Sequence, residues 1–368
     1  MDFAARGAAV VARLGRDLVR AVQRDRMLLA IGLAICAAGF ALQPFTGLRP
    51  DWDVVGRVFV KLGLVGAMAL AVLVIWRLGW LAVVARSRTP TRDMLGWARD
   101  FLAGPGLAAN AATTIAVFCL YAGGFSVLKG AIAVVSPFAW DARLADLDRA
   151  LHFGRMPHEW LGPLLGPLPL AVLNVFYNLW FFLLVVGWLG GMVAIRRQAL
   201  RHQYLMAFML TWFVGGFLVA CGFSSAGPCY YARVGLGDLY APLMERLQAA
   251  EAAYGIWAVQ TQDLLWQGFT GARPGSAGIS AFPSMHVASA TLFVLAARHL
   301  GRLAFAAATV FWLLILVGSV ALAWHYAVDG YAGTLVAILV WRLAGHYGRA
   351  IGIDAHSAPE VLRSTINP

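Results

Sequence analysis

Long apolar segments alternate with short polar segments along most of the chain. Crossing the hydrocarbon of a bilayer takes an apolar helix of roughly 20 residues. A helix on the surface of a soluble protein has one polar face, whereas the long segments here are apolar on all sides. The pattern therefore predicts an all-α, polytopic membrane helix bundle of about eight transmembrane helices. The eight segments are roughly 28–46, 58–84, 107–134, 167–195, 203–222, 283–300, 303–324 and 327–346.

The arginines between these segments indicate the orientation of the chain. They collect in the N-terminal tail, at residues 86–99, at 196–201, at 298–302 and in the C-terminal tail. With eight crossings all of these groups lie on one side of the membrane, and the positive-inside rule makes this side the cytoplasm. We therefore expect a multi-pass protein of a bacterial-type cytoplasmic (inner) membrane, with the N- and C-termini cytoplasmic.

The same pattern divides the chain into five parts. Alternating arginine and apolar residues in the first part are typical of a helix that lies on a membrane surface. A cleaved signal peptide is the alternative, although its charged region would be unusually long. Residues 236–268 also alternate with helical spacing, and they either cover a site or simply connect two crossings. The five parts are a basic amphipathic segment (1–27), three N-terminal transmembrane helices (28–134), an outer interfacial loop (135–166), a membrane core (167–346) and a cytoplasmic tail (347–368).

The composition supports a membrane protein and argues against a nucleic-acid-binding domain. Hydrophobic residues make up 61% of the chain and charged residues 13%, whereas soluble domains contain about 25% charged residues. The formal net charge is +11, but the basic residues occupy short segments between apolar ones rather than one clustered face. We therefore expect membrane lipids, and no nucleic acid, as partners of this chain.

Three ionisable residues at membrane depth are the candidates for chemistry, because ionisable groups are costly there. His286 begins the sixth apolar segment, and His325 and Asp329 lie where the eighth begins. One helical hairpin separates the two histidines, which returns them to the same side of the membrane. His325 and Asp329 are four residues apart, so a helix that begins near His325 places both on one face.

This arrangement suits a displacement at phosphorus in two steps. The carboxylate of Asp329 would hold one imidazole nitrogen of His325 and leave the other free to attack. His286 would protonate the leaving oxygen and then deprotonate the acceptor, a task for which an imidazole pKa near neutrality is suitable. For each histidine alone, simple packing in an apolar helix is the alternative. The shared location of the three residues favours the catalytic interpretation.

The motifs Phe-Pro-Ser-x-His at 282–286 and His-Tyr-x-x-Asp at 325–329 resemble those of the type 2 phosphatidic acid phosphatase superfamily. More specifically, they resemble the inositolphosphotransferase branch that contains fungal inositol phosphorylceramide synthase and its bacterial relatives. The resemblance covers residues 167–346 and implies a phosphatase or phosphotransferase core. It implies that His325 forms a phosphohistidine and that Asp329 orients it. It also implies that His286 is the general acid and base, that Ser284 helps to hold phosphate, and that no metal or other cofactor takes part.

The chain departs from the phosphatase pattern at its cationic residues. Ser319 stands where the phosphatases have an arginine six residues before the nucleophile, and residues 227–233 lack their Lys and Arg-Pro segment. This departure favours the inositol phosphorylceramide synthase-like branch, and it leaves the phosphate charge without an obvious cationic partner. The candidates for substrate binding are therefore Arg233 first and Arg273 second, together with Gly227 and Tyr230.

We expect from this resemblance a membrane lipid phosphotransferase that moves a phospho-headgroup from a phospholipid donor to an alcohol acceptor. A lipid phosphate phosphatase of the same superfamily, with water as the acceptor, is the first alternative. A polyprenyl-dependent glycosyltransferase, indicated by Asp51 and Asp53 in the first outer loop, and a transporter are alternatives of other classes. Lys129 could serve a transporter, although it more readily snorkels to an interface or faces the catalytic site.

Overall fold

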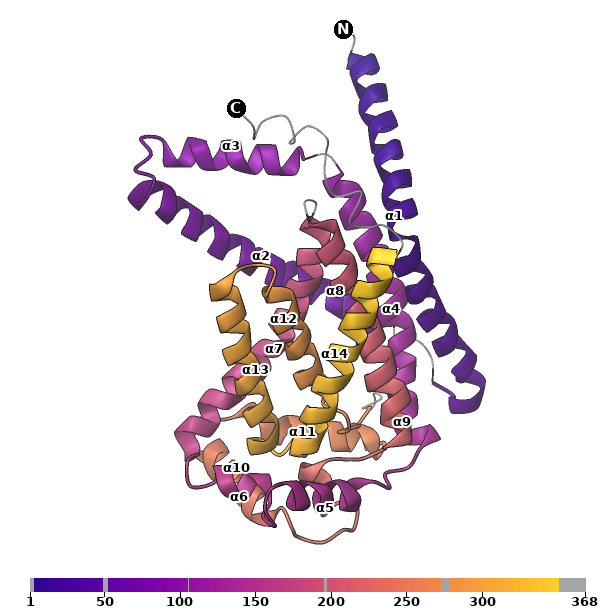
Figure 1. Cartoon of the computed structure of the whole chain (residues 1–368), viewed down its shortest axis with the longest axis vertical. Helices are drawn as coiled ribbons and strands as arrows, with labels where there is room; N and C mark the ends of the chain where they lie inside the picture. Colours follow the sequence, from indigo (N-terminus) through magenta and orange to yellow (C-terminus); the bar gives the residue numbers. More distant parts are fainter. Residues whose placement is uncertain (1–2, 49–51, 105, 195–196, 273–277, 351–368) are drawn as a thin grey trace.

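The computed structural model describes residues 3–48, 52–104, 106–194, 197–272 and 278–350 (Figure 1). These residues are mostly helical and contain no strand, which confirms the predicted all-α fold. The α-helices are α1 (Phe3–Thr46), α2 (Trp52–Val83), α3 (Pro90–Leu102), α4 (Leu107–Val135), α5 (Asp141–Leu151), α6 (Pro157–Leu161), α7 (Pro167–Val193), α8 (Gln198–Phe213), α9 (Ala220–Gly222), α10 (Ala241–Tyr254), α11 (Trp257–Phe269), α12 (Met285–Ala297), α13 (Arg302–Ala321) and α14 (Ala327–Ala350). A π-helix, Val214–Val219, joins α8 to α9, and Pro228–Tyr230 forms a 3₁₀ helix.

Seven candidate membrane spans among the described residues make this a multi-pass helix bundle. They coincide with seven of the predicted crossings, but the predicted sixth crossing is wrong in its length. In its place lies α12, which has 13 residues and is therefore about 20 Å long, shorter than the hydrocarbon of a bilayer. The helix begins only at Met285, because Ser284 has an extended backbone and serves as the N-cap.

Helices α7, α8, α12, α13 and α14 form a bundle along the long axis of the molecule (Figure 1). Helix α12 packs against α13 and α14, α14 packs against α8, and α4 joins the bundle through α7. Helix α1 packs along α4. Helices α5, α6, α10 and α11 lie across one end of the bundle, which we call the capped end. Helices α2 and α3 pair with each other near the opposite end.

The N-terminal part of the chain does not break at the expected boundary near residue 27. Helix α1 is one continuous helix of 44 residues, so the predicted surface segment and the predicted first crossing belong to the same element. The expected outer loop at 135–166 contains α5 and α6, and most of 236–268 forms α10 and α11. Both pairs lie at the capped end, where they cover the turns between the long helices.

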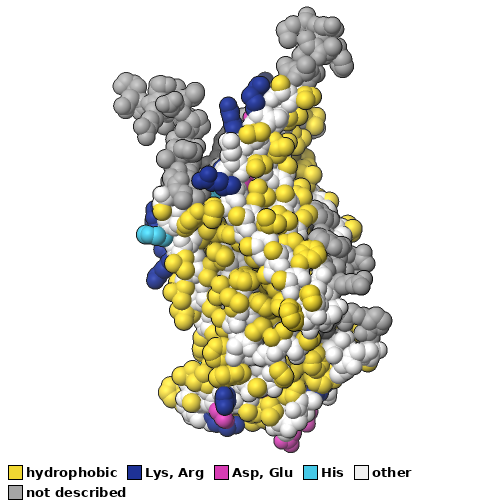
Figure 2. Space-filling view, turned by 90° about the vertical axis from the view of Figure 1, so that its right-hand side faces the viewer, with side chains coloured by type: hydrophobic (Ala, Val, Ile, Leu, Met, Phe, Trp, Pro, Cys, Tyr) yellow, Lys and Arg dark blue, Asp and Glu magenta, His cyan; other side chains and the backbone are white. Residues whose placement is uncertain are grey.

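The outside of the bundle is apolar over most of its height. Figure 2 shows hydrophobic side chains across the middle of one face, with lysine and arginine side chains near its upper and lower ends. Exposed large residues such as Leu179, Phe181, Val310 and Leu313 contribute to the apolar surface of α7 and α13. Soluble monomers rarely expose an apolar surface of this extent, and it matches the hydrocarbon of a bilayer.

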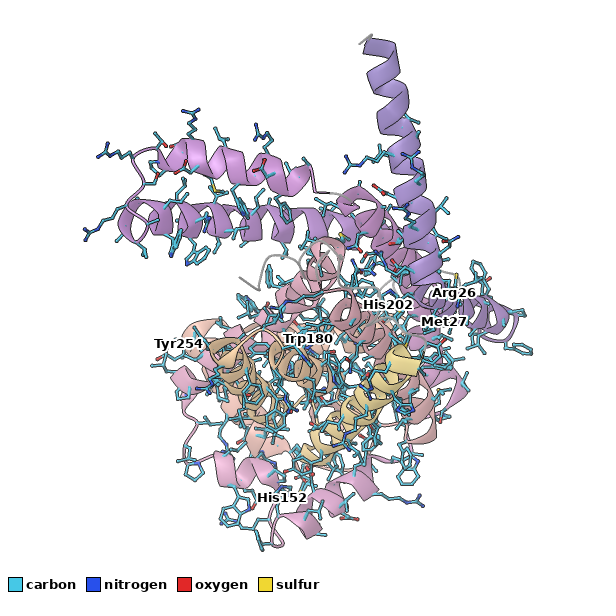
Figure 3. All side chains as sticks on the ribbon, turned by 45° about the horizontal axis from the view of Figure 1, so that its top comes forward. Arg26, Met27, His152, Trp180, His202 and Tyr254 are labelled. Atoms are coloured by element: carbon cyan, nitrogen blue, oxygen red, sulfur yellow. The ribbon has the colours of Figure 1, made fainter. Side chains whose placement is uncertain are left out.

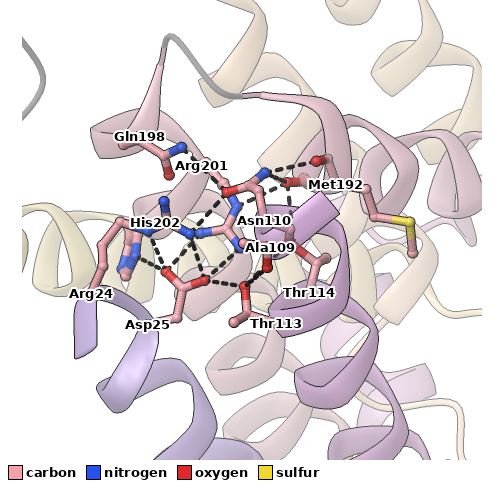
Figure 4. Close-up of polar contacts among 11 residues, drawn as sticks. Arg24, Asp25, Ala109, Asn110, Thr113, Thr114, Met192, Gln198, Arg201 and His202 are labelled. Carbon is pink, nitrogen blue, oxygen red and sulfur yellow. Dashed lines mark hydrogen bonds and ion pairs between the residues drawn. The ribbon is translucent and has the colours of Figure 1, made fainter. Parts of the chain in front are cut away.

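A buried ionic network joins α1, α4 and α8 (Figure 4). Asp25 accepts two hydrogen bonds from the guanidinium of Arg201, each 2.9 Å long. The same carboxylate accepts a hydrogen bond of 2.5 Å from the hydroxyl of Thr113 and lies 2.6 Å from Nε2 of His202. Arg24 donates to both of its oxygens as well. One carboxylate on α1 is therefore bound by donors from three helices.

The network includes one of the arginines that indicated the orientation of the chain. Arg201 lies within α8 rather than in the predicted turn before it, and its side chain and that of Asp25 have no exposed surface. A charged group inside a membrane protein needs a partner of opposite charge or a polar cavity. The bidentate pair meets this need and fixes the N-terminal helices to the bundle.

Candidate active site

His325 lies in the turn between α13 and α14, at the capped end of the bundle. Its Nδ1 lies 2.8 Å from the carbonyl oxygen of Ala281 and 3.3 Å from Oδ2 of Asp329. A carbonyl oxygen can only accept a hydrogen bond, so Nδ1 carries the proton and Nε2 keeps its lone pair. The backbone of the turn is held too, since His325 N donates to the carbonyl oxygen of Ser319. This geometry leaves the lone pair of Nε2 available.

Nδ1 of His325 has two partners, the carbonyl oxygen of Ala281 and the carboxylate of Asp329. The carbonyl oxygen is the nearer of the two. The carboxylate of Asp329 also accepts a hydrogen bond of 3.0 Å from the backbone N–H of Tyr326, just before α14. This contact satisfies a donor that the start of a helix leaves unpaired. The carbonyl oxygen of Asp329 accepts a hydrogen bond of 2.9 Å from Ser284 N. Asp329 therefore also joins the start of α14 to the start of α12.

His286 lies in the first turn of α12, and its ring faces that of His325. The two ring centres are 5.9 Å apart. The His286 ring packs against Tyr177, with ring centres 4.4 Å apart, and against Trp180, with ring centres 4.0 Å apart. Figure 3 shows Trp180 inside the bundle. Two imidazoles at this separation can reach one phosphoryl group, so the structure brings the predicted histidines into one site.

Two aspartates of α5 hold the turns that form the site, and the sequence analysis did not single them out. Asp148 accepts hydrogen bonds of 2.8 and 2.9 Å from the first two backbone N–H groups of α14. Asp141 accepts hydrogen bonds of 2.8 Å from Gly227 N and from the hydroxyl of Tyr326. Their spacing of seven residues, which places both on one face of α5, is a signal that the sequence offered.

The segment that begins at Gly227 packs beside the His325 turn and binds other parts of the protein. Gly227 has a φ of +101°, and an added Cβ would lie 2.9 Å from the carbonyl oxygen of Trp324. The hydroxyl of Tyr230 donates to the carbonyl oxygen of Gln262 at 2.9 Å, and Gln262 Nε2 donates to that of Leu322 at 2.9 Å. Gly227 and Tyr230 therefore help to shape the His325 turn. Their contact with substrate stays a prediction.

Ser284 serves as the N-cap of α12. Its Oγ accepts a hydrogen bond of 3.4 Å from Val287 N, and the residue is fully buried. The π-helix packs against this start: a Cβ added to Gly215 or Gly216 would lie 3.4 or 3.5 Å from the Met285 sulfur. Short π-helical segments are frequent at functional sites, and here the π-helix packs directly against the start of α12. Phosphate binding by Ser284 stays a prediction.

Arg233, the first of the two arginines predicted to bind phosphate, has other partners in the structure. Arg233 forms an ion pair with Asp263 at the surface. Its guanidinium also lies over the ring of Trp266, 5.7 Å from the ring centre. Arg273 lies outside the described residues. The acidic pair of the glycosyltransferase alternative is not described either, since Asp51 and the side chain of Asp53 fall outside the described part.

Lys129 of α4 provides the positive charge near the site. Its backbone and side chain pack against Gly278, where an added Cβ would lie 2.6 Å from the Lys129 carbonyl oxygen and 3.0 Å from its Cγ. Lys129 lies within electrostatic reach of both His286 and His325. Within the described part of the chain, its ammonium group has no ion pair or hydrogen bond. It is therefore available to an anionic substrate.

The surroundings of His325 favour its neutral form. Burial lowers the pKa of His325 to about 3, against the opposing effect of its hydrogen bond to the Ala281 carbonyl and with a contribution from the charge of Lys129. A neutral imidazole with a free Nε2 is the form that attacks phosphorus. The site therefore combines a neutral imidazole with a free Nε2, a second histidine and the lysine of α4.

Residues 142–343 match the family model of the PAP2 superfamily. The match covers more than half of the chain, and it begins in α5 rather than at the expected start of the core near residue 167. No significant match was found among curated proteins or among solved structures. The chain therefore belongs to the PAP2 superfamily, whose members are phosphatases or phosphotransferases that act on phosphate esters.

Proposed function

We propose that this protein is a metal-independent membrane lipid phosphotransferase that works through a phosphohistidine on His325. The observation that carries the proposal is the facing pair of imidazoles, 5.9 Å apart between ring centres. In that pair, the hydrogen bond to Ala281 leaves Nε2 of His325 free. A free nucleophile opposite a second acid–base group is what a double displacement requires.

In the first step, Nε2 of His325 attacks the phosphorus of a phospholipid, and the bond from phosphorus to the lipid alcohol oxygen breaks. Protonated His286 gives its proton to that leaving oxygen. In the second step, neutral His286 takes the proton of the acceptor hydroxyl, whose oxygen attacks phosphorus. The phosphorus–nitrogen bond then breaks, and its electron pair returns to His325. Lys129 would offset the charge that develops on the phosphoryl oxygens.

The walls of the site favour an alcohol over water as the acceptor. The rings of Tyr177 and Trp180 pack on His286, and Trp324 lies parallel to Tyr177 with ring centres 6.4 Å apart. Aromatic side chains on the general base limit the access of bulk water. A hydroxyl delivered within the membrane would reach the same base, so transfer is favoured over hydrolysis.

We further place the protein in the inositol phosphorylceramide synthase-like branch, with the site on the extracytoplasmic side of the cytoplasmic membrane. Ser319 supports the placement, because it is fully buried and its hydroxyl donates to the carbonyl oxygen of Leu316 at 2.7 Å. The position at which the phosphatases have an arginine thus holds a buried serine near the end of α13. The orientation rests on the distribution of arginines along the chain.

The test is an assay of the purified full-length protein with a phospholipid extract labelled at phosphorus. Wild type, His325→Ala and the control His346→Ala, an exposed histidine on α14, are compared with and without a chelator. We expect label to move to an alcohol acceptor in wild type and in the control, with and without chelator, and not in His325→Ala. Release of the water-soluble headgroup phosphate, or of inorganic phosphate from a lipid phosphate monoester, without transfer to an alcohol would assign the hydrolase activity instead. Activity that needs a metal or survives His325→Ala would overturn the mechanism.

A further inference from the structure

A cavity of about 590 Å³ lies among α8, α12 and α14, and neither His286 nor His325 lines it. Leu295 and His299 line it at the C-terminal end of α12, and Ile338 and Arg349 line it along the second half of α14. Both helices begin at the candidate active site, so their C-terminal halves lie toward the opposite end of the bundle. A cavity of this volume is large enough for a small ligand or a headgroup.

Three arginines surround this cavity. Arg298 comes from the end of α12, and Arg342 and Arg349 lie seven residues apart on one face of α14. None of the three has an ion pair or a side-chain hydrogen bond within the described part of the chain, and all three are exposed. Among the described residues, no aspartate or glutamate lines the cavity. The cations therefore remain open to an anionic ligand.

The inner wall of the cavity is fixed by packing. The side-chain amide of Gln203 donates to the carbonyl oxygen of Trp341 at 3.1 Å, which ties α8 to α14. Gly345 allows this close approach, because an added Cβ would lie 2.4 Å from Nε2 of Gln203. Trp341 is itself buried. The cavity is thus part of the packed bundle rather than a gap between mobile side chains.

The cavity changes from apolar to basic along the bundle axis. Leu295 and Ile338 line its part nearer the middle of the bundle, and the three arginines lie toward the end. A free anion needs only the basic part, whereas a phospholipid has a charged headgroup joined to an apolar chain. Basic pockets between transmembrane helices at the cytoplasmic surface are suited to such headgroups. We propose that this cavity binds the phosphate headgroup of an anionic phospholipid, separately from the candidate active site.

Arginines at this end of the bundle also serve as topology signals, so the test needs a control with the same change of charge. Arg86, Arg88 and Arg92 provide it, because they lie in the turn between α2 and α3 and at the start of α3. They are exposed, have no ion pair within the described part, and do not line the cavity.

The experiment measures lipid binding by the full-length protein in detergent. The site variant replaces Arg298, Arg342 and Arg349 by glutamine, and the control variant replaces Arg86, Arg88 and Arg92 by glutamine. Phosphatidylglycerol, phosphatidylcholine and inorganic phosphate are titrated against each protein by native mass spectrometry and by the shift of the melting temperature. The unliganded melting temperatures show whether each variant is folded.

We expect the site variant to bind phosphatidylglycerol on the order of a hundredfold more weakly than wild type, since each interfacial arginine contributes about a fivefold factor. The control variant should bind like wild type, and phosphatidylcholine should bind weakly to all three proteins. Equal binding of phosphatidylglycerol by the site variant and wild type would overturn the proposal. Binding of inorganic phosphate as tight as that of the lipid would overturn the assignment to a phospholipid. The readout is binding, so it is independent of the proposed enzymatic activity.

Discussion

Replacing Asp25 by alanine should destabilise this protein more than the loss of an ordinary ion pair. The carboxylate is fully buried on α1 and binds both terminal nitrogens of Arg201 on α8, each at 2.9 Å. Without the Asp25 carboxylate, the buried guanidinium of Arg201 would still donate to the carbonyl oxygen of Gly191 at 2.8 Å and to the hydroxyl of Thr114 at 2.7 Å. These are neutral acceptors, so a full positive charge would remain buried without a counter-charge.

The expected loss follows from this change. Removing one partner of a buried ion pair costs about 3–5 kcal/mol of stability. At roughly 2–4 °C per kcal/mol for a chain of a few hundred residues, the melting temperature should fall by about 10 °C. The double variant Asp25→Leu with Arg201→Met removes both charges and fills similar volume. It should recover at least half of the loss, because a buried pair is often replaced by apolar residues at little cost.

The assay is thermal unfolding of the full-length protein in one detergent, followed by tryptophan fluorescence. Asp100→Ala is the matched control, because Asp100 pairs with Arg99 while their side chains are 71% and 81% exposed. Such a pair contributes at most about 1 kcal/mol, so the control should lose no more than about 4 °C. A loss in Asp25→Ala no larger than in Asp100→Ala would refute the reasoning. A double variant no more stable than Asp25→Ala would contradict the role of the unpaired arginine.

Three further predictions concern the candidate active site. Lys129→Gln should lower kcat/KM for phospholipid about a hundredfold, because it removes a group that stabilises developing charge. Arg233→Gln should lower kcat/KM less than tenfold. Equal effects would contradict the assignment of Lys129 as the cation that binds phosphate. Gly227→Ala should lower activity and melting temperature more than Gly235→Ala. Both glycines have positive φ (+101° and +83°), but only a Cβ at 227 would clash with a neighbouring atom. Similar losses would show that the close approach of Gly227 to Trp324 is unimportant. Because the pKa of His325 falls from 6.5 unfolded to about 3 folded, its contribution to stability is present above pH 6.5 and is lost as the pH falls toward 3. The free energy of unfolding of wild type relative to His325→Gln should therefore decrease as the pH falls from 7.5 to 5, by up to about 1.4 kcal/mol per pH unit below pH 6.5. A constant difference would contradict a depressed pKa.

The long helices and the pair of histidines could be predicted from the sequence because both depend on short-range patterns. Apolar length predicts a crossing, and a hairpin of two crossings returns His286 and His325 to one side of the membrane. The length of α12 was not predictable in this way. Hydropathy continues through the segment, but the helix starts at Met285, where Ser284 N is bound by a carbonyl of another helix.

The contacts that hold the site depend on residues far apart in the chain, and sequence patterns do not show them. The nearer partner of the His325 ring is a backbone carbonyl 44 residues away, which no side-chain motif can indicate. Asp148 binds the start of α14 from 179 residues away. Arg201 was counted among the arginines of the turn at 196–201, because such a count does not distinguish a turn residue from a helical residue in a buried pair with Asp25. Lys129 was noted, but its position near the histidines required the packing of α4.

The central claim is that His325 becomes covalently phosphorylated during turnover. The most direct measurement is to mix the purified protein with phospholipid labelled at phosphorus, quench with alkali during turnover, and locate the label by mass spectrometry. The account predicts an alkali-stable, acid-labile label on His325 in wild type, with and without chelator, and none in His325→Gln. Turnover without any label on His325, or a label on another residue, would contradict it.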